Sequence, residues 1–135
     1  MTVPRFLLDT NMIIYIRRNR PPQVQKRFHQ LEAGAAAISV ITYGELRYGA
    51  EKSTSRDSSL ERLAALVSLL PVLALPDSAA ETYGLLRAEL ERRGEMIGGN
   101  DLWIAAHALS EQFTLVTNNV REFQRIPGLA IENWI

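Results

Sequence analysis

The stretch Phe6-Leu7-Leu8-Asp9-Thr10-Asn11 is a short apolar run that stops at a carboxylate followed by two small polar residues. A run this apolar suits a strand buried on both faces, as in a parallel sheet covered by helices. In open sheets of this kind, functional sites lie at the carboxyl ends of the strands. Asp9 is therefore the first candidate for a functional group.

Strand-like and helix-like segments alternate along the rest of the chain. Short apolar runs predict further strands at 36–40, 72–75 and 113–117, with an edge strand at 129–131. Helical spacing of apolar residues predicts helices at 11–18, 23–33, 41–51, 60–70, 77–93 and 100–112, with 53–59 as a loop or helix entry. Such alternation predicts an α/β fold with a mostly parallel sheet of four to five strands and helices on both faces.

Length and composition point to one globular domain spanning residues 1–135, since 47% of the residues are hydrophobic and 22% are charged. The absence of Cys excludes disulfides, thiol catalysis and thiolate metal sites. No signal peptide is evident, and the longest apolar stretch, 63–75, is interrupted by Ser68 and Pro71. It is too short to span a membrane. We expect a soluble, cytoplasmic protein.

The charges are distributed unevenly although the formal net charge is zero. Residues 1–50 carry seven basic and three acidic groups, a net of +4, whereas residues 51–135 carry eight basic and twelve acidic groups, a net of −4. The first half is therefore the better place for a polyanion. Most of the cations are Arg, which binds phosphate in a bidentate manner, although codon bias explains the excess equally well.

Three acidic residues fall where this fold would bring them together, namely Asp9 after the first strand, Glu45 after the second and Asp101 at the start of the last long helix. Each has a simpler explanation as a helix cap. Asp9 or Thr10 can cap the first helix, Thr42 to Glu45 has capping-box spacing, and Asn100-Asp101 can cap the last. A cap contributes about 1 kcal/mol, which is sufficient reason for any one of them.

Capping does not require the three acids to share one cleft. Two carboxylates about 4 Å apart repel by roughly 4 kcal/mol at an effective dielectric of 20, so something must offset the repulsion. A divalent cation is the simplest answer. A cluster of oxygen ligands without Cys or clustered His favours Mg²⁺ or Mn²⁺ over Zn²⁺.

Four segments in order, 7–11, 39–46, 100–108 and 115–119, together resemble the PIN-domain ribonucleases and, more narrowly, the VapC-type toxins of bacterial toxin–antitoxin pairs. The resemblance covers essentially the whole chain and implies the three-layer PIN fold. It implies that Asp9, Glu45 and Asp101 hold Mg²⁺, for which Mn²⁺ would substitute. Asn119 matches a fourth catalytic position that is often Asp, and the small polar residues of the pocket would be Asn11, Thr117 and Asn118.

The same resemblance implies a Mg²⁺-dependent endoribonuclease that hydrolyses phosphodiester bonds in structured RNA, with a tRNA anticodon stem-loop and initiator tRNA favoured. It also implies a homodimer and a cognate VapB-type antitoxin that blocks the site. Basic residues in the first half are candidate phosphate contacts: Arg17, Arg18, Arg20, Lys26 and Arg27.

Other readings of the chain remain open at this point. His29 and His107 could act as the acid and base of a metal-independent ribonuclease, although a surface or half-buried role is the simpler expectation. A metal-dependent phosphatase also places Asp after its first strand, but the later Lys expected of it is missing. A non-catalytic protein-binding module would use an apolar surface formed by Met12, Ile13, Tyr15, Ile16 and the stripe in 60–70. Trp103 and Trp134 are expected to pack in the core and at the C-terminus.

Overall fold

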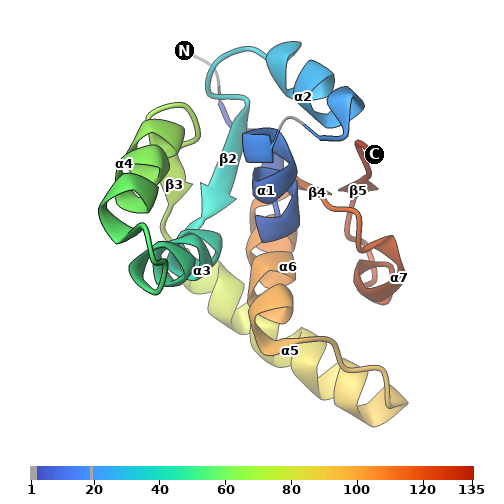
Figure 1. Ribbon diagram of the computed structural model, residues 1–135. Coiled ribbons are helices and arrows are strands. Elements are labelled where there is room, and N and C mark those ends of the chain that lie inside the picture. Colours follow the sequence, from blue (N-terminus) through green and yellow to red (C-terminus); the bar gives the residue numbers. More distant parts are fainter. Residues whose placement is uncertain (1–2, 19) are drawn as a thin grey trace.

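The computed structural model describes residues 3–18 and 20–135, and its centre is a sheet of short parallel strands (Figure 1). The strand order is β3-β2-β1-β4-β5, so the first strand of the chain is the middle one. The strands are β1 (Phe6–Leu8), β2 (Ala36–Ser39), β3 (Val72–Leu73), β4 (Thr114–Val116) and β5 (Ile131–Glu132). Every pairing between neighbours is parallel, which brings the carboxyl ends of all five strands to one edge.

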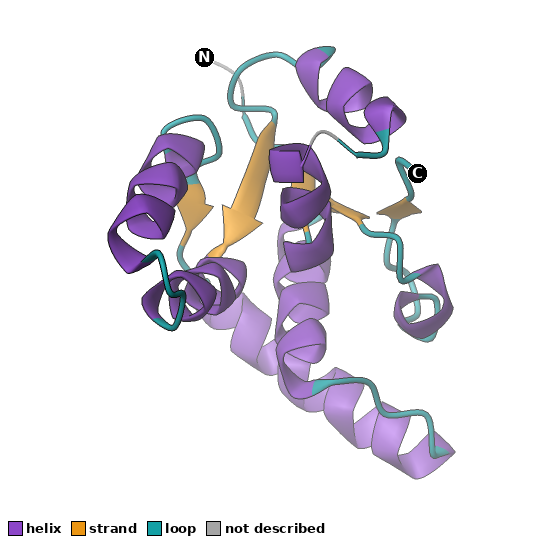
Figure 2. Ribbon diagram, in the orientation of Figure 1, coloured by secondary structure: helices purple, strands orange, loops and turns teal. Residues whose placement is uncertain are grey.

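Helices cover both faces of this sheet, as the alternation in the sequence predicts. They are α1 (Thr10–Arg18), α2 (Pro22–His29), α3 (Val40–Glu51), α4 (Arg56–Val67), α5 (Asp77–Arg93), α6 (Gly99–Glu111) and α7 (Val120–Phe123). In Figure 1, α1 lies in front of the sheet and α5 and α6 lie behind it. Figure 2 shows that α5 projects beyond the other helices.

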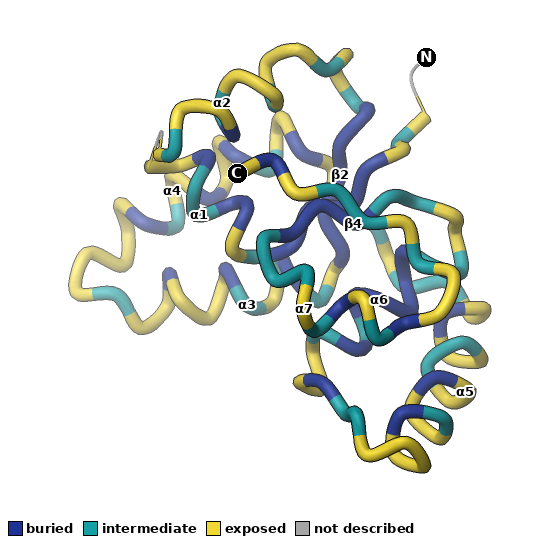
Figure 3. Tube along the Cα trace, turned by 90° about the vertical axis from the view of Figure 1, so that its right-hand side faces the viewer, coloured by how far each residue is buried: buried dark blue, intermediate teal, exposed yellow. Residues whose placement is uncertain are grey.

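Alternate residues of β1 divide the core between the two faces. Phe6 and Leu8 pack with α1, α2, α3 and α4 in one apolar cluster, whereas Leu7 packs with α5, α6 and Phe123 of α7 in the other. This is the period-two alternation of a strand that is covered on both sides. The strands form the buried centre of the tube in Figure 3, while the outer side of α5 is exposed. The predicted α/β fold with three layers is confirmed.

Local sequence signals explain where several helices begin and end. Pro22 opens α2 at its first position, as predicted, and Gly94 ends α5 in a left-handed conformation with φ 67°. Asp9 caps α1, since its Oδ1 accepts a hydrogen bond from the Met12 N–H at 3.0 Å. The predicted cap at the end of the first strand is therefore confirmed.

Several predicted boundaries are wrong. The second helix ends at His29 rather than at 33, because tight turns with bonds such as Leu31 N to Phe28 O replace the helical pattern. The helix expected at 60–70 begins at Arg56, within the segment interpreted as a loop or helix entry, and ends at Val67. Residue 40 belongs to α3, and the edge strand lies at Ile131–Glu132 rather than 129–131. The short helix α7 was not predicted.

Among the helices of residues 3–18 and 20–135, none combines the length and apolar composition needed to cross a bilayer.

Candidate active site

Asp9 lies at the carboxyl end of the central strand and is almost completely buried, with 4% of its surface exposed. One carboxylate oxygen accepts the Met12 N–H that caps α1, and the other accepts a hydrogen bond from Thr117 Oγ1 at 2.5 Å. Burial raises the pKa of Asp9, these two hydrogen bonds counteract the rise, and the charge of Glu45 adds to it. Asp9 is thus a buried acid whose oxygens are held in place by two different elements.

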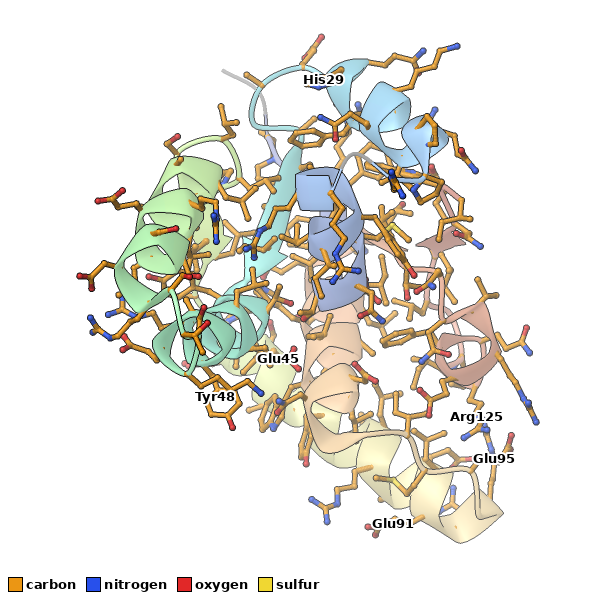
Figure 4. The ribbon with its side chains drawn as sticks, viewed as in Figure 1. His29, Glu45, Tyr48, Glu91, Glu95 and Arg125 are labelled. Carbon is orange, nitrogen blue, oxygen red and sulfur yellow. The ribbon has the colours of Figure 1, made fainter. Side chains whose placement is uncertain are left out.

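Glu45 lies on α3 and is half-buried. Its Oε1 accepts a hydrogen bond from Thr10 Oγ1, the first residue of α1, at 2.7 Å. Figure 4 shows Glu45 on the side of α3 that faces α6. The hydrogen bond with Thr10 links α1, which follows β1, to α3, which follows β2.

The capping-box interpretation of Glu45 is wrong. The cap of α3 is Ser39, whose Oγ accepts the Ile41 N–H at 3.1 Å, three residues before the predicted position. Thr42 is instead a buried residue in the first turn, and its hydroxyl has no hydrogen-bond partner among the described residues. Capping therefore does not explain Glu45.

Asp101 lies in the first turn of α6, and no side chain caps that helix, so the Asn100-Asp101 capping interpretation is also wrong. The pKa of Asp101 is raised to about 6. Burial is the largest cause, followed by the charges of Glu122, Asp9 and Glu45. Two of these charges belong to the other predicted acids, which therefore act on Asp101 electrostatically, and the third belongs to a further acid, Glu122.

The fourth acid, Glu122, was missed by sequence reasoning. It lies on α7, and its Oε2 accepts a hydrogen bond from the Asn119 side-chain amide at 2.5 Å. Its charge is the largest electrostatic contribution to the raised pKa of Asp101. The available signal was an acidic residue a few positions beyond the end of the fourth strand, but that segment carries no periodicity long enough to predict a helix.

The other pocket residues differ in what they contact. Thr117 is fully buried and, besides donating to Asp9, accepts the Asn119 N–H at 2.9 Å. Asn118 donates from Nδ2 to the Tyr15 hydroxyl at 2.9 Å, and its buried Oδ1 has no partner among the described residues. Asn11 is exposed, and its backbone N–H contributes a hydrogen bond that lowers the pKa of Asp9.

A hard cation such as Mg²⁺ or Mn²⁺ requires oxygen ligands. The site offers carboxylate oxygens without sulfur or imidazole, which matches Mg²⁺ or Mn²⁺. No Lys or Arg is paired with Asp9 or Asp101 in the described structure. Within residues 3–18 and 20–135, however, no group of three or more acidic or histidine side chains lies close enough together to hold a metal ion. A cation at this position would therefore also need oxygen ligands from water and substrate.

The two histidines do not form an acid–base pair. His107 is buried, with 1% exposed, so the expected surface or half-buried role is wrong for it. Its Nδ1 lies 2.9 Å from Ser39 Oγ, and burial lowers its pKa while Glu111 partly opposes this. His29 is exposed near Gln25 and lies at the top of the view in Figure 4, well away from Glu45 in the middle.

Most of the apolar surface expected for a binding module is not exposed. Met12, Ile13 and Ile16 are core residues, and Leu63 and Leu70 of the stripe in 60–70 are buried in the same cluster. Tyr15, Leu60 and Val67 are only partly buried and pack against that cluster.

Trp134 packs as predicted, since it is buried against Phe6 with ring centroids 5.9 Å apart. Trp103 is half-buried rather than a core residue and stacks on Tyr83 with ring centroids 3.8 Å apart.

The candidate phosphate contacts fall into two groups. Arg17, Arg18, Arg20 and Lys26 are exposed. Arg27 is engaged, since its Nη2 lies 2.8 Å from Glu132 Oε1 and its guanidinium lies over the Trp134 ring.

Comparison with known proteins identifies the family to which the chain belongs. The PIN domain family matches residues 6–129. The chain is 45% identical over 130 residues to the tRNA(fMet)-specific endonuclease VapC of Salmonella typhimurium, covering 96% of this chain and 98% of that protein. It is 43% identical over 131 residues to ribonuclease VapC2 of Haemophilus influenzae, covering 97% and 98%.

A solved structure, that of DNA-bound VapBC from Salmonella typhimurium, superimposes with a TM-score of 0.92 at 43% identity, covering 98% of this chain and all of the matched chain. PIN-domain ribonucleases are, as a class, metal-dependent. The chain therefore belongs to the PIN-domain family and, within it, to the VapC-type ribonuclease toxins.

Proposed function

We propose that this endoribonuclease toxin uses Mg²⁺, held by Asp9, Glu45 and Asp101, to hydrolyse phosphodiester bonds in structured RNA. The observation that supports this most strongly is the raised pKa of Asp101, to which Glu122, Asp9 and Glu45 all contribute. Acids gathered without a basic partner gain stabilisation from a cation. Mn²⁺, with the same preference for oxygen, would substitute for Mg²⁺.

A divalent cation at this position would polarise the phosphate and make a coordinated water more acidic. The protein's own contribution is to fix the acids. Thr117 and the Met12 N–H orient the two oxygens of Asp9, and the Thr10 hydroxyl orients Glu45. Among the described residues of the site, the hydroxyl groups of Thr10 and Thr117 donate hydrogen bonds to carboxylates, so we expect water to attack. From the resemblance to PIN-domain ribonucleases, we expect products with 5′-phosphate and 3′-hydroxyl ends.

Asn119 supports the site through Glu122 in this proposal. Its amide donates to Glu122 and its backbone N–H donates to Thr117, which in turn donates to Asp9. The sequence interpretation gave Asn119 the fourth catalytic position itself. We now propose that Glu122 supplies the fourth charge and that Asn119 orients it. Asn11, Thr117 and Asn118 remain proposed pocket residues.

For the substrate, we infer tRNA, with the initiator tRNA anticodon stem-loop favoured. The support is the 45% identity to a VapC described as specific for tRNA(fMet). Arg17, Arg18, Arg20, Lys26 and Arg27 are retained as proposed contacts to RNA phosphates.

We also propose a cognate VapB-type antitoxin as partner, because the chain resembles the toxin in VapBC complexes over nearly its whole length. A homodimer, a single PIN domain over residues 1–135 and a cytoplasmic location belong to the same proposal.

The test incubates the purified protein with total tRNA in Mg²⁺ or in EDTA and maps the cleaved ends, with Asp9→Asn as the inactive control. Cleavage that needs the metal, is lost in the variant and leaves 5′-phosphate ends is expected. A binding module would show no cleavage for EDTA to remove, and a phosphatase would release inorganic phosphate without cutting the chain. Equal cleavage by Asp9→Asn and the unaltered protein would show that the proposed site is wrong.

A further inference from the structure

A groove of about 630 Å³ lies between α1, α3 and α4 and reaches the candidate active site. Thr10 and Glu45, which are hydrogen-bonded to each other, form part of its lining. Arginines from two helices line the same groove, Arg17 and Arg18 from α1 and Arg62 from α4. A ligand lying in the groove would therefore contact these arginines and also reach Glu45 of the candidate active site.

These three arginines differ from most others in the described part of the chain. None of them has an acidic partner within ion-pair distance there. The arginines that do have such a partner lie elsewhere: Arg27, Arg47, Arg56, Arg87, Arg92 and Arg93. A groove that gathers unpaired guanidinium groups repels cations and attracts a polyanion.

The guanidinium of Arg62 is held in place by a chain of hydroxyl groups. Its Nη2 donates to Ser59 Oγ at 3.3 Å, and Ser59 Oγ donates to Ser53 Oγ at 3.1 Å. Ser53 Oγ in turn accepts the Ser55 N–H at 3.1 Å. Ser59 is buried, with 6% exposed, so this chain is anchored in the protein. An arginine fixed in this way loses less conformational entropy when it binds phosphate.

We propose that this groove binds the sugar-phosphate backbone of the RNA strand beside the scissile bond, with Arg62 of α4 contacting phosphate together with Arg17 and Arg18 of α1. The inference rests on the proposed ribonuclease function. RNA is favoured over a protein segment because three guanidinium groups without an acidic partner among the described residues line one groove, and a phosphate backbone offers negative charge to all three. The acids of the candidate site repel phosphate, and the arginines offset the repulsion a short distance away.

The test compares Arg62→Gln with Arg56→Gln. Arg56 lies on the same helix, but it is paired with Glu51 and Asp57 and does not line the groove. Both substitutions remove one positive charge, so a difference between them reports position rather than net charge. Binding of a fluorescent anticodon stem-loop RNA is measured by anisotropy in EDTA, which prevents cleavage, over a range of NaCl concentrations.

For Arg62→Gln we expect the slope of log K against log salt to fall in magnitude by about 0.7 to 0.9, and affinity at about 0.1 M salt to fall roughly fivefold. Arg56→Gln should bind like the unaltered protein. Arg62→Lys should recover most of the salt slope, since a phosphate contact needs mainly the charge. Arg17→Gln should resemble Arg62→Gln and serves as a second test should Arg62→Gln fail to fold.

Failure of this inference is distinguishable from failure of the proposed function. If Asp9→Asn abolishes cleavage while Arg62→Gln and Arg17→Gln leave affinity and salt slope unchanged, the groove does not bind RNA and the ribonuclease proposal stands. If those variants bind RNA normally but weaken the complex with a purified antitoxin, the groove belongs to the protein partner and the inference is overturned.

Discussion

Asp9 and Asp101 belong to the same candidate site but are accommodated by the protein in different ways. Asp9 is the more deeply buried, and its two oxygens accept hydrogen bonds from Thr117 and the Met12 N–H. Asp101 receives no hydrogen bond from the described residues, and burial and three neighbouring acids raise its pKa to about 6. The hydrogen bonds of the fold therefore offset part of the cost of burying the charge on Asp9, whose pKa is still raised, whereas no hydrogen bond from the described residues offsets the charge on Asp101.

The largest expected effect is on catalysis. Asp9→Asn keeps the shape of the side chain and removes its charge, so cleavage of tRNA in Mg²⁺ should fall by about 10³-fold, equivalent to roughly 4 kcal/mol. Initial cleavage rates on a denaturing gel measure this, and far-ultraviolet circular dichroism checks that the fold is intact. A rate within tenfold of the unaltered protein would remove Asp9 from the mechanism.

The next effect concerns the hydrogen bond from Thr117 that orients Asp9. Thr117→Val removes the donor to Asp9 Oδ2 and leaves that buried oxygen unpartnered, which should cost about 1–3 kcal/mol of the free energy of unfolding. Thr10→Val is the matched control, because its hydrogen bond to Glu45 is only partly buried and its loss should cost about 1 kcal/mol or less. Urea denaturation in EDTA measures both. Equal losses would mean that burial does not distinguish the two acids.

In contrast to Thr117→Val, Asp101→Asn should increase the free energy of unfolding in the absence of metal. The folded-state pKa of about 6 lies above the ordinary value of 3.8, so the unfolded chain loses its proton first as pH rises. The charge on Asp101 therefore destabilises the fold fully above about pH 6, and the effect disappears as pH falls below the unfolded pKa. We expect a gain of about 1–3 kcal/mol at pH 8 in EDTA, almost none at about pH 3, and a smaller gain with Mg²⁺ at pH 8.

A gain that persists in full below about pH 3 would contradict this explanation, because Asp101 is then mostly protonated in both the folded and the unfolded protein.

The smallest predicted effect concerns His107. Burial lowers its pKa, so the unfolded chain takes up a proton first as pH falls. The contribution of His107 to stability is full above the unfolded pKa of about 6.5 and is lost as pH falls below it. Thermal melting of the unaltered protein and His107→Gln between pH 7.5 and 5 should show a difference that shrinks by about 1 kcal/mol or less. A constant difference would mean that His107 does not titrate in this range.

The sequence predicts most of the fold because its strongest signals are local. The apolar run in β1, the proline that opens α2 and the glycine that ends α5 act through neighbouring residues. Asp9 was found for the same reason, since its position at the end of a strand is visible in the sequence.

The features that the sequence did not predict depend on tertiary contacts or on element boundaries that no local pattern reveals. Glu122 enters the site only because α7 packs against the sheet through Phe123, and four residues are too few for a periodic pattern. The Ser39 cap was missed because Thr42 to Glu45 has equally good capping spacing, and the choice depends on where β2 ends. The contact between His107 and Ser39 joins residues far apart in sequence, so no local pattern predicts it.

The order of the acids along the chain has a consequence for synthesis. Asp9 leaves the ribosome early, Glu45 and Asp101 follow, and Glu122 is translated more than a hundred residues after Asp9. Thr117, which holds Asp9 in place, also comes from this late segment. A partly made chain therefore contains the first carboxylate without the groups that orient it or complete its charge cluster. The candidate site can therefore be complete only after the C-terminal segment that carries Thr117 and Glu122 has been translated.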